Sequence, residues 1–261
     1  MLFVGDVMGS AGRRALRQEL EGLVDRERVD FVAVNVENVA GGFGITGPVL
    51  EELDDLPIDV RTTGNHVWDK KEGIPLLDAH PYLLRPANYP DGNPGRGWCV
   101  SETAAGVPLA VINLQGQVFM TPIENPFRTA DAVLEAIKAE HPEVRLVLVD
   151  MHAEATSEKQ GLGWYLDGRV TAVLGTHTHV PTADERILPG GTALQTDVGM
   201  TGPYESIIGM KPAKVLERFL FNTPRPFEPA KKDIRLCGTL VDADEETGNA
   251  LAIRRVSLSI S

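Results

Sequence analysis

Short apolar runs recur along the chain, and stretches with helical spacing separate them. The runs cover 2–4, 31–34, 60–63, 109–112, 146–149 and 170–174, of which 60–63 is the weakest. Their length and β-branched content are typical of strands. The apolar residues stand at consecutive rather than alternate positions, which indicates sheets covered on both faces. The chain is therefore expected to form a layered α/β fold with two sheets facing each other.

Helices are expected between these runs. Apolar positions within 16–24 follow the 3-4 spacing of a buried helix face. A short helix is expected after Pro48. Asn125 followed by Pro126 has the pattern of an N-cap with proline in the first helical position.

The last third of the chain has a different pattern. It predicts a hairpin over 186–194, a helix that carries Val215, and two strands over 234–241 and 251–260. No linker or low-complexity segment divides the sequence, so residues 1–261 are expected to form one domain.

Composition limits the classes of protein that the chain can represent. Apolar residues make up 43% of the sequence, which excludes a disordered chain. Lys and Arg total 25 against 37 Asp and Glu, and the net charge of −12 argues against a duplex nucleic-acid partner. Cys99 and Cys237 are too few for a disulfide framework or a thiolate metal site. The sequence has no visible secretion signal and no apolar run near ~18 residues, so a cytoplasmic protein without a membrane span is expected.

Polar side chains follow five of the apolar runs, at the point where each run ends. These side chains are Asp6, Glu37, Asn38, Asn65, His66, His152, His177 and His179. Ligands of open α/β sheets bind beyond the carboxyl ends of the strands, where loops converge. We therefore expect these residues to form one site.

Histidine placement favours a metal site. Four of the six histidines belong to this set. A single histidine at a strand end is more often structural, but four together with two acids favour metal ligation. His177 and His179 are two residues apart, so both rings can point to the same side of an extended chain. His80 and His141 each precede a proline and indicate turns or helix ends.

The donor atoms of this set are nitrogen and oxygen only. Such donors suit iron, manganese or zinc and differ from those of a cysteine-rich structural zinc site. One Asp, one Glu, neutral amides and imidazoles would leave two metals electropositive. A pair of that kind would attract and polarise a phosphate despite the acidic surface.

The order of these residues resembles that of the calcineurin-like metallophosphoesterases. That superfamily has an Asp after the first strand, a bridging acid after the second, Gly-Asn-His after the third, a lone His, and two His that are two residues apart. The matching blocks of this sequence are Gly5-Asp6, Glu37-Asn38, Gly64-Asn65-His66, His152 and His177-Thr178-His179.

Two departures from that pattern identify a branch of the superfamily. Met8 stands where the superfamily usually has His, and Val36-Glu37-Asn38 replaces the usual Gly-Asp block. With the stretches 37–42 and 195–200, these departures resemble the YmdB-like phosphodiesterases of bacteria over nearly the whole chain.

The resemblance implies a fold and an activity. The fold is a four-layer αββα sandwich with two mixed β-sheets. The activity is hydrolysis of 2′,3′- or 3′,5′-cyclic nucleotides, or both, through a dinuclear metal centre with a bridging hydroxide nucleophile. Iron is the implied metal, with manganese or zinc as alternatives. A small phosphodiester is the implied partner, and a homo-oligomer is left open.

The resemblance also implies residue roles. Glu37 would bridge the two metals, and His66 would donate a proton to the departing ribose oxygen. The other implied ligands are Asp6, Asn38 and His179 for the first metal, and Asn65, His152 and His177 for the second. The superfamily often has an acid directly after the catalytic His, but here Val67 and Trp68 precede Asp69. The partner that orients His66 is therefore left open.

Three weaker features have alternative interpretations. Residues 42–47 match G-x-G-x-x-G, which is weak evidence for dinucleotide binding and is better explained as a loop beside the metal site. Arg85 could meet a phosphate, although a packing role is the simpler explanation. Asp197 is either a partner of a ligand histidine or an acid in a turn.

Two other functional classes stay open at this stage. A regulatory protein could use the same metals to sense nucleotides with little turnover. The intact His66 favours the enzyme, because binding alone would not require an acid. An oxidoreductase that binds a dinucleotide would use 42–47 instead, with no tightly held metal.

Overall fold

Two mixed sheets of six strands each lie at the centre of the computed structural model, which describes residues 1–224 and 226–260. The first sheet has the order β10-β11-β1-β2-β3, with β12 paired to β11. Its strands are β1 (Leu2–Val4), β2 (Val32–Asn35), β3 (Val60–Thr62), β10 (Gly202–Pro203), β11 (Ile234–Ala243) and β12 (Ala250–Ser259). The first three run parallel to one another, and β11 is antiparallel to β1.

The second sheet has the order β4-β5-β6-β7-β9-β8. Its strands are β4 (Trp98–Glu102), β5 (Pro108–Gln115), β6 (Leu146–His152), β7 (Ala172–Thr176), β8 (Arg186–Ile187) and β9 (Ala193–Gln195). The four inner strands are parallel, and the edge strands β4 and β8 are antiparallel to their neighbours. The expected hairpin over 186–194 is confirmed by the pairing of β8 with β9.

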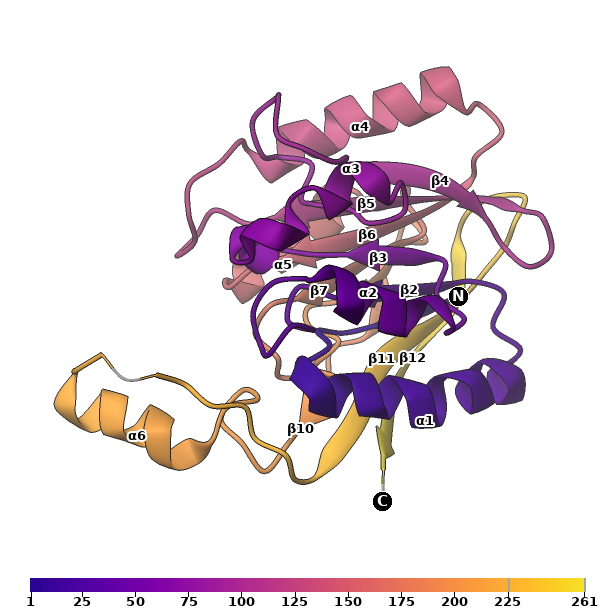
Figure 1. The fold of residues 1–261 in the computed structure, drawn as a ribbon. Coiled ribbons are helices and arrows are strands. Elements are labelled where there is room, and N and C mark those ends of the chain that lie inside the picture. Colours follow the sequence, from indigo (N-terminus) through magenta and orange to yellow (C-terminus); the bar gives the residue numbers. More distant parts are fainter. Residues whose placement is uncertain (225, 261) are drawn as a thin grey trace.

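Helices cover the outer faces of both sheets (Figure 1). The helices α1 (Gly9–Glu27) and α2 (Gly47–Asp54) pack on the first sheet, and α4 (Pro126–Glu140) and α5 (Thr156–Tyr165) pack on the second. No helix among residues 1–224 and 226–260 has both the length and the apolar content that a bilayer crossing requires.

Side-chain alternation along the strands separates the layers. Phe3 points between the two sheets, where it shares a cluster with Leu148 of the second sheet. Its neighbours Leu2 and Val4 point the other way and pack with the buried face of α1. In β6, Val147 likewise faces α4 and α5. Both faces of the central strands are thus buried, as the consecutive apolar runs indicated, and the αββα sandwich that the resemblance implied is confirmed.

Several elements differ from the sequence-based expectation. The strand expected at 170–174 lies at Ala172–Thr176, and β4, β10 and α5 were not predicted. The edge strand β4 is only partly apolar, and α5 contains Gly161 and Gly163 and has a weakly periodic pattern. Three short helical turns, η1 (Asn65–Trp68), η2 (Lys71–Gly73) and α3 (Leu76–Ala79), follow β3. His80 and His141 directly follow α3 and α4, as expected.

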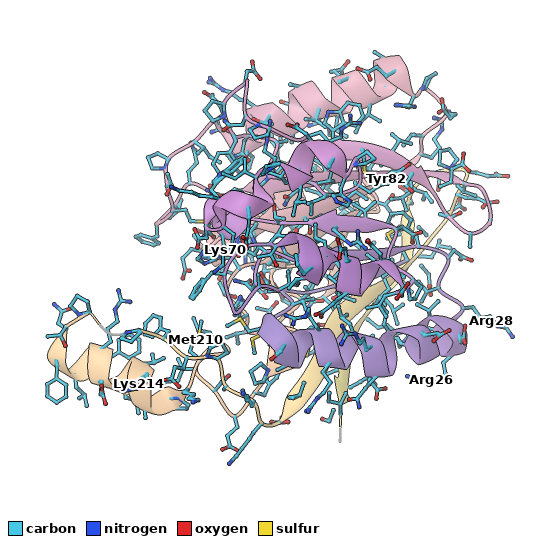
Figure 2. The ribbon with its side chains drawn as sticks, viewed as in Figure 1. Arg26, Arg28, Lys70, Tyr82, Met210 and Lys214 are labelled. Atoms are coloured by element: carbon cyan, nitrogen blue, oxygen red, sulfur yellow. The ribbon has the colours of Figure 1, made fainter. Side chains whose placement is uncertain are left out.

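The helix α6 (Pro212–Phe221) projects from the body of the molecule on a segment of which residues 204–224 and 226–230 are described and which we call the arm (Figure 1). Figure 2 shows Met210 at the root of the arm and Lys214 on the helix. The predicted helix is present, but its apolar pattern does not face the core. Within α6, all of whose residues the structure describes, only Val215 is buried, and Phe219 and Phe221 are 73% and 66% exposed.

Phe3→Ala is expected to destabilise the sandwich strongly. The side chain is fully buried between the sheets, and removing it should cost about 3–5 kcal/mol because a cavity remains. Phe221→Ala removes the same group from an exposed position and should change the free energy of unfolding by no more than about 0.5 kcal/mol. Urea unfolding of both variants tests this expectation, and similar losses for the two would contradict it.

Candidate metal centre

The carboxyl ends of strands from both sheets meet at one place. Glu37 follows β2 of the first sheet and His152 ends β6 of the second, and Glu37 Oε1 lies 3.1 Å from His152 Nε2. Asn65 follows β3, and its Oδ1 lies 3.0 Å from the same nitrogen. Gly64 permits this approach, since a Cβ there would stand 2.2 Å from the His152 ring. The expected site therefore forms between two sheets rather than along the edge of one.

Glu37, His152 and His177 form a cluster with the geometry of a metal site. Each offers one ligand atom, and these atoms all lie within 4.8 Å of one another. His177 Nδ1 is 3.1 Å from His152 Nε2. Two imidazole nitrogens and a carboxylate oxygen converging on one point are a donor set for iron, manganese or zinc.

A second group of donors lies next to this cluster. His179 Nε2 is 3.7 Å from Asp6 Oδ1. Asp6 Oδ1 and Asn38 Oδ1 are buried and accept no hydrogen bond from the described residues. Asn38 Nδ2 donates to the Gly42 carbonyl oxygen at 3.0 Å, so the amide is held by its nitrogen end. Buried oxygens without a donor are unfavourable, and a cation would satisfy both, so the residues present fit a metal.

Two of the candidate ligand histidines are each held by a bond to the ring nitrogen that faces away from the cluster. His152 Nδ1 lies 2.9 Å from Thr176 Oγ1, and that hydroxyl donates to Asp150 Oδ1 at 2.6 Å. His179 Nδ1 is 3.0 Å from the carbonyl oxygen of Ile208, to which it donates. Bonds of this kind fix the tautomer and the orientation of a ligand ring.

Burial and mutual charge set the protonation of the cluster without metal. Burial would raise the pKa of Glu37, but the charge of His152 and its hydrogen bond hold that pKa at about 2. Burial would lower the pKa of His152, but the charge of Glu37 raises it to about 9. Burial and the neighbouring His152 together lower the pKa of His177 to about 3. At neutral pH and without metal, His177 is therefore neutral, and His152 carries a proton that a metal would displace.

The turn that carries His177 and His179 has an unfavourable backbone. Their φ angles are 95° and 65°, in the left-handed region that side chains other than glycine rarely adopt. Thr178 between them donates from its backbone N–H and its hydroxyl to Asp197 Oδ2, at 3.1 and 2.6 Å. Lys159 Nζ donates to the same oxygen at 2.8 Å. This ion pair is almost fully buried, at 2% and 1% exposure, and holds the turn in place.

The sequence only partly predicted the role of Asp197. Asp197 was expected to be either a partner of a ligand histidine or an acid in a turn, and it accepts hydrogen bonds from Thr178, the residue between His177 and His179. Lys159 was not singled out, because α5 was not predicted and lysine side chains usually lie in solvent. The apolar run of β9 (Ala193–Gln195), which ends shortly before Asp197, was a signal in the sequence that Asp197 is buried.

The partner of His66, left open by the sequence, is Asp69. Asp69 Oδ2 lies 2.8 Å from His66 Nδ1. The short helical turn η1 brings the two together over three residues. The backbone N–H of His66 also donates to Glu37 Oε2 at 3.0 Å. His66 is thus tied by its backbone to Glu37 of the candidate metal-ligand cluster and oriented by Asp69.

A cavity of about 480 Å³ opens beside the cluster. Glu37, His66, His177 and His179 line one side of it, with Asn38. The loop at 42–47 was expected near the metal site, and its first two residues, Gly42 and Phe43, do line the cavity.

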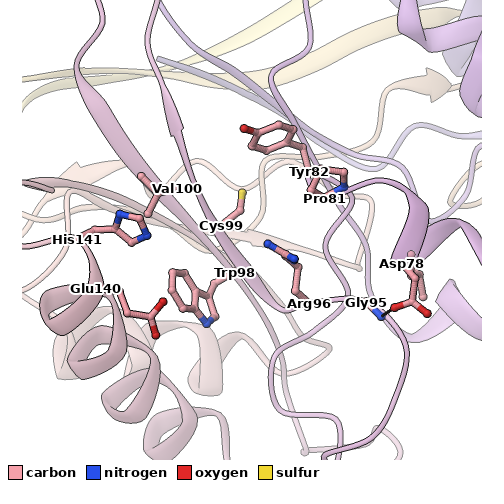
Figure 3. Close-up of a pocket in the computed structure, with 11 residues that line it drawn as sticks. Asp78, Pro81, Tyr82, Gly95, Arg96, Trp98, Cys99, Val100, Glu140 and His141 are labelled. Carbon is pink, nitrogen blue, oxygen red and sulfur yellow. Dashed lines mark hydrogen bonds between the residues drawn. The ribbon is translucent and has the colours of Figure 1, made fainter.

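Arg85 lies elsewhere and packs in the protein. It is buried, and its guanidinium donates to the carbonyl oxygens of Pro86 and Pro94. A separate cavity of about 560 Å³ lies beside β4 and the end of α4, where Arg96, Trp98 and His141 line it (Figure 3). None of the candidate site residues lines that cavity.

An αββα sandwich with acids, amides and imidazoles at the carboxyl ends of both sheets is the arrangement of a metallophosphoesterase. Comparison with known proteins supports this class. YmdB-like proteins match residues 2–256. A Bacillus subtilis (strain 168) protein named 2′,3′-cyclic-nucleotide 2′-phosphodiesterase is 46% identical over 99% of this chain and 97% of its own length.

Solved structures agree with the sequence comparison. A crystal structure of a hypothetical protein from Thermus thermophilus has a TM-score of 0.91 and 44% identity, covering 99% of this chain and 98% of the other. A structure described as a novel phosphatase, from Mycoplasma pneumoniae, has a TM-score of 0.92 and 34% identity, covering 99% and 92%. The chain belongs to the YmdB-like protein family.

Asp197→Asn is expected to weaken metal binding about 10–100-fold. The variant removes the charge that pairs with Lys159 and loosens Thr178, so the turn carrying His177 and His179 can relax. Asp131→Asn is the matched control, because it disrupts an exposed ion pair with Arg169. Competition with a chelator measures both affinities, and equal affinity in the two variants would contradict the expectation.

Metal affinity is expected to rise with pH. His152, with its pKa raised to about 9, must lose a proton when it ligates. Glu37 and His177, with pKa values of about 2 and 3, are already deprotonated above pH 5. Burial also raises the pKa of Asp6, so the affinity should increase at least about tenfold per pH unit from pH 7 toward 9, with at least one proton released. Calorimetry in buffers of different ionisation enthalpy counts that proton, and a flat profile would contradict this expectation.

Proposed function

We propose that this phosphoric diester hydrolase opens the phosphate ring of 2′,3′-cyclic nucleotides, with 3′,5′-cyclic nucleotides as a second substrate class. The cluster of Glu37, His152 and His177 beside an oriented His66 carries the proposal. The name of the Bacillus subtilis relative supports the substrate class.

In this proposal two metal ions occupy the site, with iron first and manganese or zinc as alternatives. Glu37 would contact both. Asp6, Asn38 and His179 would complete the first position, and Asn65, His152 and His177 would complete the second. When bound, the ions would supply Lewis acidity toward the phosphate. The unpartnered oxygens of Asp6 and Asn38 and the spacing of the Glu37 cluster support these assignments.

His66 would act as the general acid for the departing ribose oxygen. Asp69 engages Nδ1 and so leaves Nε2 for the substrate. His66 lines the cavity, and its side chain is 27% exposed, so a ligand can reach it.

The other functional classes fit these residues less well. A nucleotide sensor with little turnover would need the ligands but would not need an acid oriented by a carboxylate. In a dinucleotide-binding oxidoreductase, the strand that follows the glycine-rich loop would end in an acid for the ribose. That strand, β3, leads to Asn65, which faces His152.

His66→Ala should keep the metals and lower turnover of 2′,3′-cyclic AMP about 10²–10⁴-fold, the usual contribution of a general acid. With bis(p-nitrophenyl) phosphate the loss should be smaller, because that leaving group needs no proton. Glu37→Ala should lose metal and activity together, since Glu37 would contact both ions. Elemental analysis and steady-state kinetics on the two substrates measure these effects.

Two results would count against the proposal. If His66→Ala lowers turnover equally on both substrates, His66 is not the general acid. A metal-loaded protein that retains cyclic nucleotides without hydrolysing them would favour the nucleotide-sensing alternative.

A further inference from the structure

The wall of the cavity that faces the metal-ligand cluster is apolar. Its side chains come from the loop after β2 and from the arm, and they include Phe43, Ile207, Ile208, Met210, Phe219 and Phe227. Phosphate chemistry at the cluster uses none of these groups. An apolar wall beside a polar reaction centre is typical of a site whose ligand has both a charged and an apolar part.

The arm is fixed at its root to the metal-ligand turn. The carbonyl oxygen of Ile208 accepts from His179 Nδ1 at 3.0 Å. Met210 and Val215 pack with Met8, which follows β1, in a separate apolar cluster. Lys211 also pairs with Glu228 across the arm at 2.6 Å. The wall therefore has a defined position relative to the cluster and does not depend on a flexible lid.

Two side chains of α6 reach this cavity while remaining open to solvent. Phe219 lines the cavity, and the residue is 73% exposed. Arg218 also lines it, with its guanidinium carbon 5.1 Å from the centre of the Phe227 ring. Among the described residues that line this cavity, Arg218 is the only lysine or arginine. An aromatic face and a guanidinium plane at the same rim are groups on which a nucleobase stacks.

We propose that Phe219, Phe227 and Arg218 form a nucleobase subsite of this enzyme. The inference rests on the proposed function and specifies how the substrate lies. The cyclic phosphate faces Glu37 and His66, and the base extends toward α6. A cavity of about 480 Å³ is within the range of small-molecule sites and exceeds what a bare phosphate needs. Because stacking uses the face of the base and not its edges, the subsite accepts purines and pyrimidines alike.

The test compares a substrate that has a base with one that lacks it. The substrates are 2′,3′-cyclic AMP and methyl β-ribofuranoside 2,3-cyclic phosphate. Phe219→Ala is the main variant, because an exposed side chain can be removed without loss of the fold. Phe221→Ala is the matched control, since Phe221 lies on the same helix, is 66% exposed and does not line the cavity.

Phe219→Ala should lower kcat/KM for 2′,3′-cyclic AMP about 5- to 150-fold, through KM with kcat retained. It should leave the base-free substrate unchanged, and Phe219→Trp should restore KM. Arg218→Ala should show the same substrate-dependent pattern. Phe221→Ala should change neither substrate.

Three results would overturn the subsite. One is a loss of kcat/KM in Phe219→Ala that is equal on both substrates. Another is a loss of kcat/KM in Phe221→Ala that equals the loss in Phe219→Ala. The third is a loss that accompanies a change of oligomeric state in sedimentation, which would assign the exposed face of α6 to a second copy of the chain.

If the proposed function is wrong, the outcome differs from that of a wrong subsite. If the metal-loaded protein hydrolyses neither substrate, calorimetric binding of 2′,3′-cyclic AMP tests the subsite separately. Weaker binding in Phe219→Ala than in Phe221→Ala then supports it, and equal binding overturns it.

Discussion

The contact between Glu37 and His152 joins the two sheets where their strands end. Glu37 belongs to the first sheet and His152 to the second, and both are fully buried. Burial opposes both charges, yet the mutual attraction holds the pKa of Glu37 at about 2 and that of His152 at about 9. A lone charge at this depth would be very unfavourable. The packing between the sheets, around residues such as Phe3, is what brings the two groups together.

The surroundings of this contact are buried and in part strained. His177 and His179 adopt positive φ angles, a conformation that the buried pair of Lys159 and Asp197 maintains through Thr178. A strained backbone conformation of this kind persists only where contacts with the surrounding structure hold it in place. The sandwich core provides that support, because strands with both faces buried cannot shift to relieve a turn at their ends.

Two regions of the molecule, the sandwich and the arm, contribute side chains to the same cavity. The sandwich places the acids, amides and imidazoles, and the arm adds an apolar wall to the same cavity. The bond from His179 to the Ile208 carbonyl oxygen connects the regions. In the proposed enzyme, the first region performs the chemistry on the phosphate and the second selects substrates that carry a base.

The sequence by itself indicated a layered α/β fold and a set of candidate site residues, and its resemblance to a known family implied the αββα sandwich. Consecutive apolar residues indicated strands buried on both faces, and the polar residues after those strands, from Asp6 to His179, were expected to gather where the strands end. The partner of His66, the burial of Lys159 and the exposure of Phe219 could not be derived in this way. Local pattern specifies which face of an element is apolar, but only the packing of distant segments decides whether that face meets protein, a ligand or water. Tertiary structure therefore decided which residues position the candidate site and which side chains line the cavity beside it.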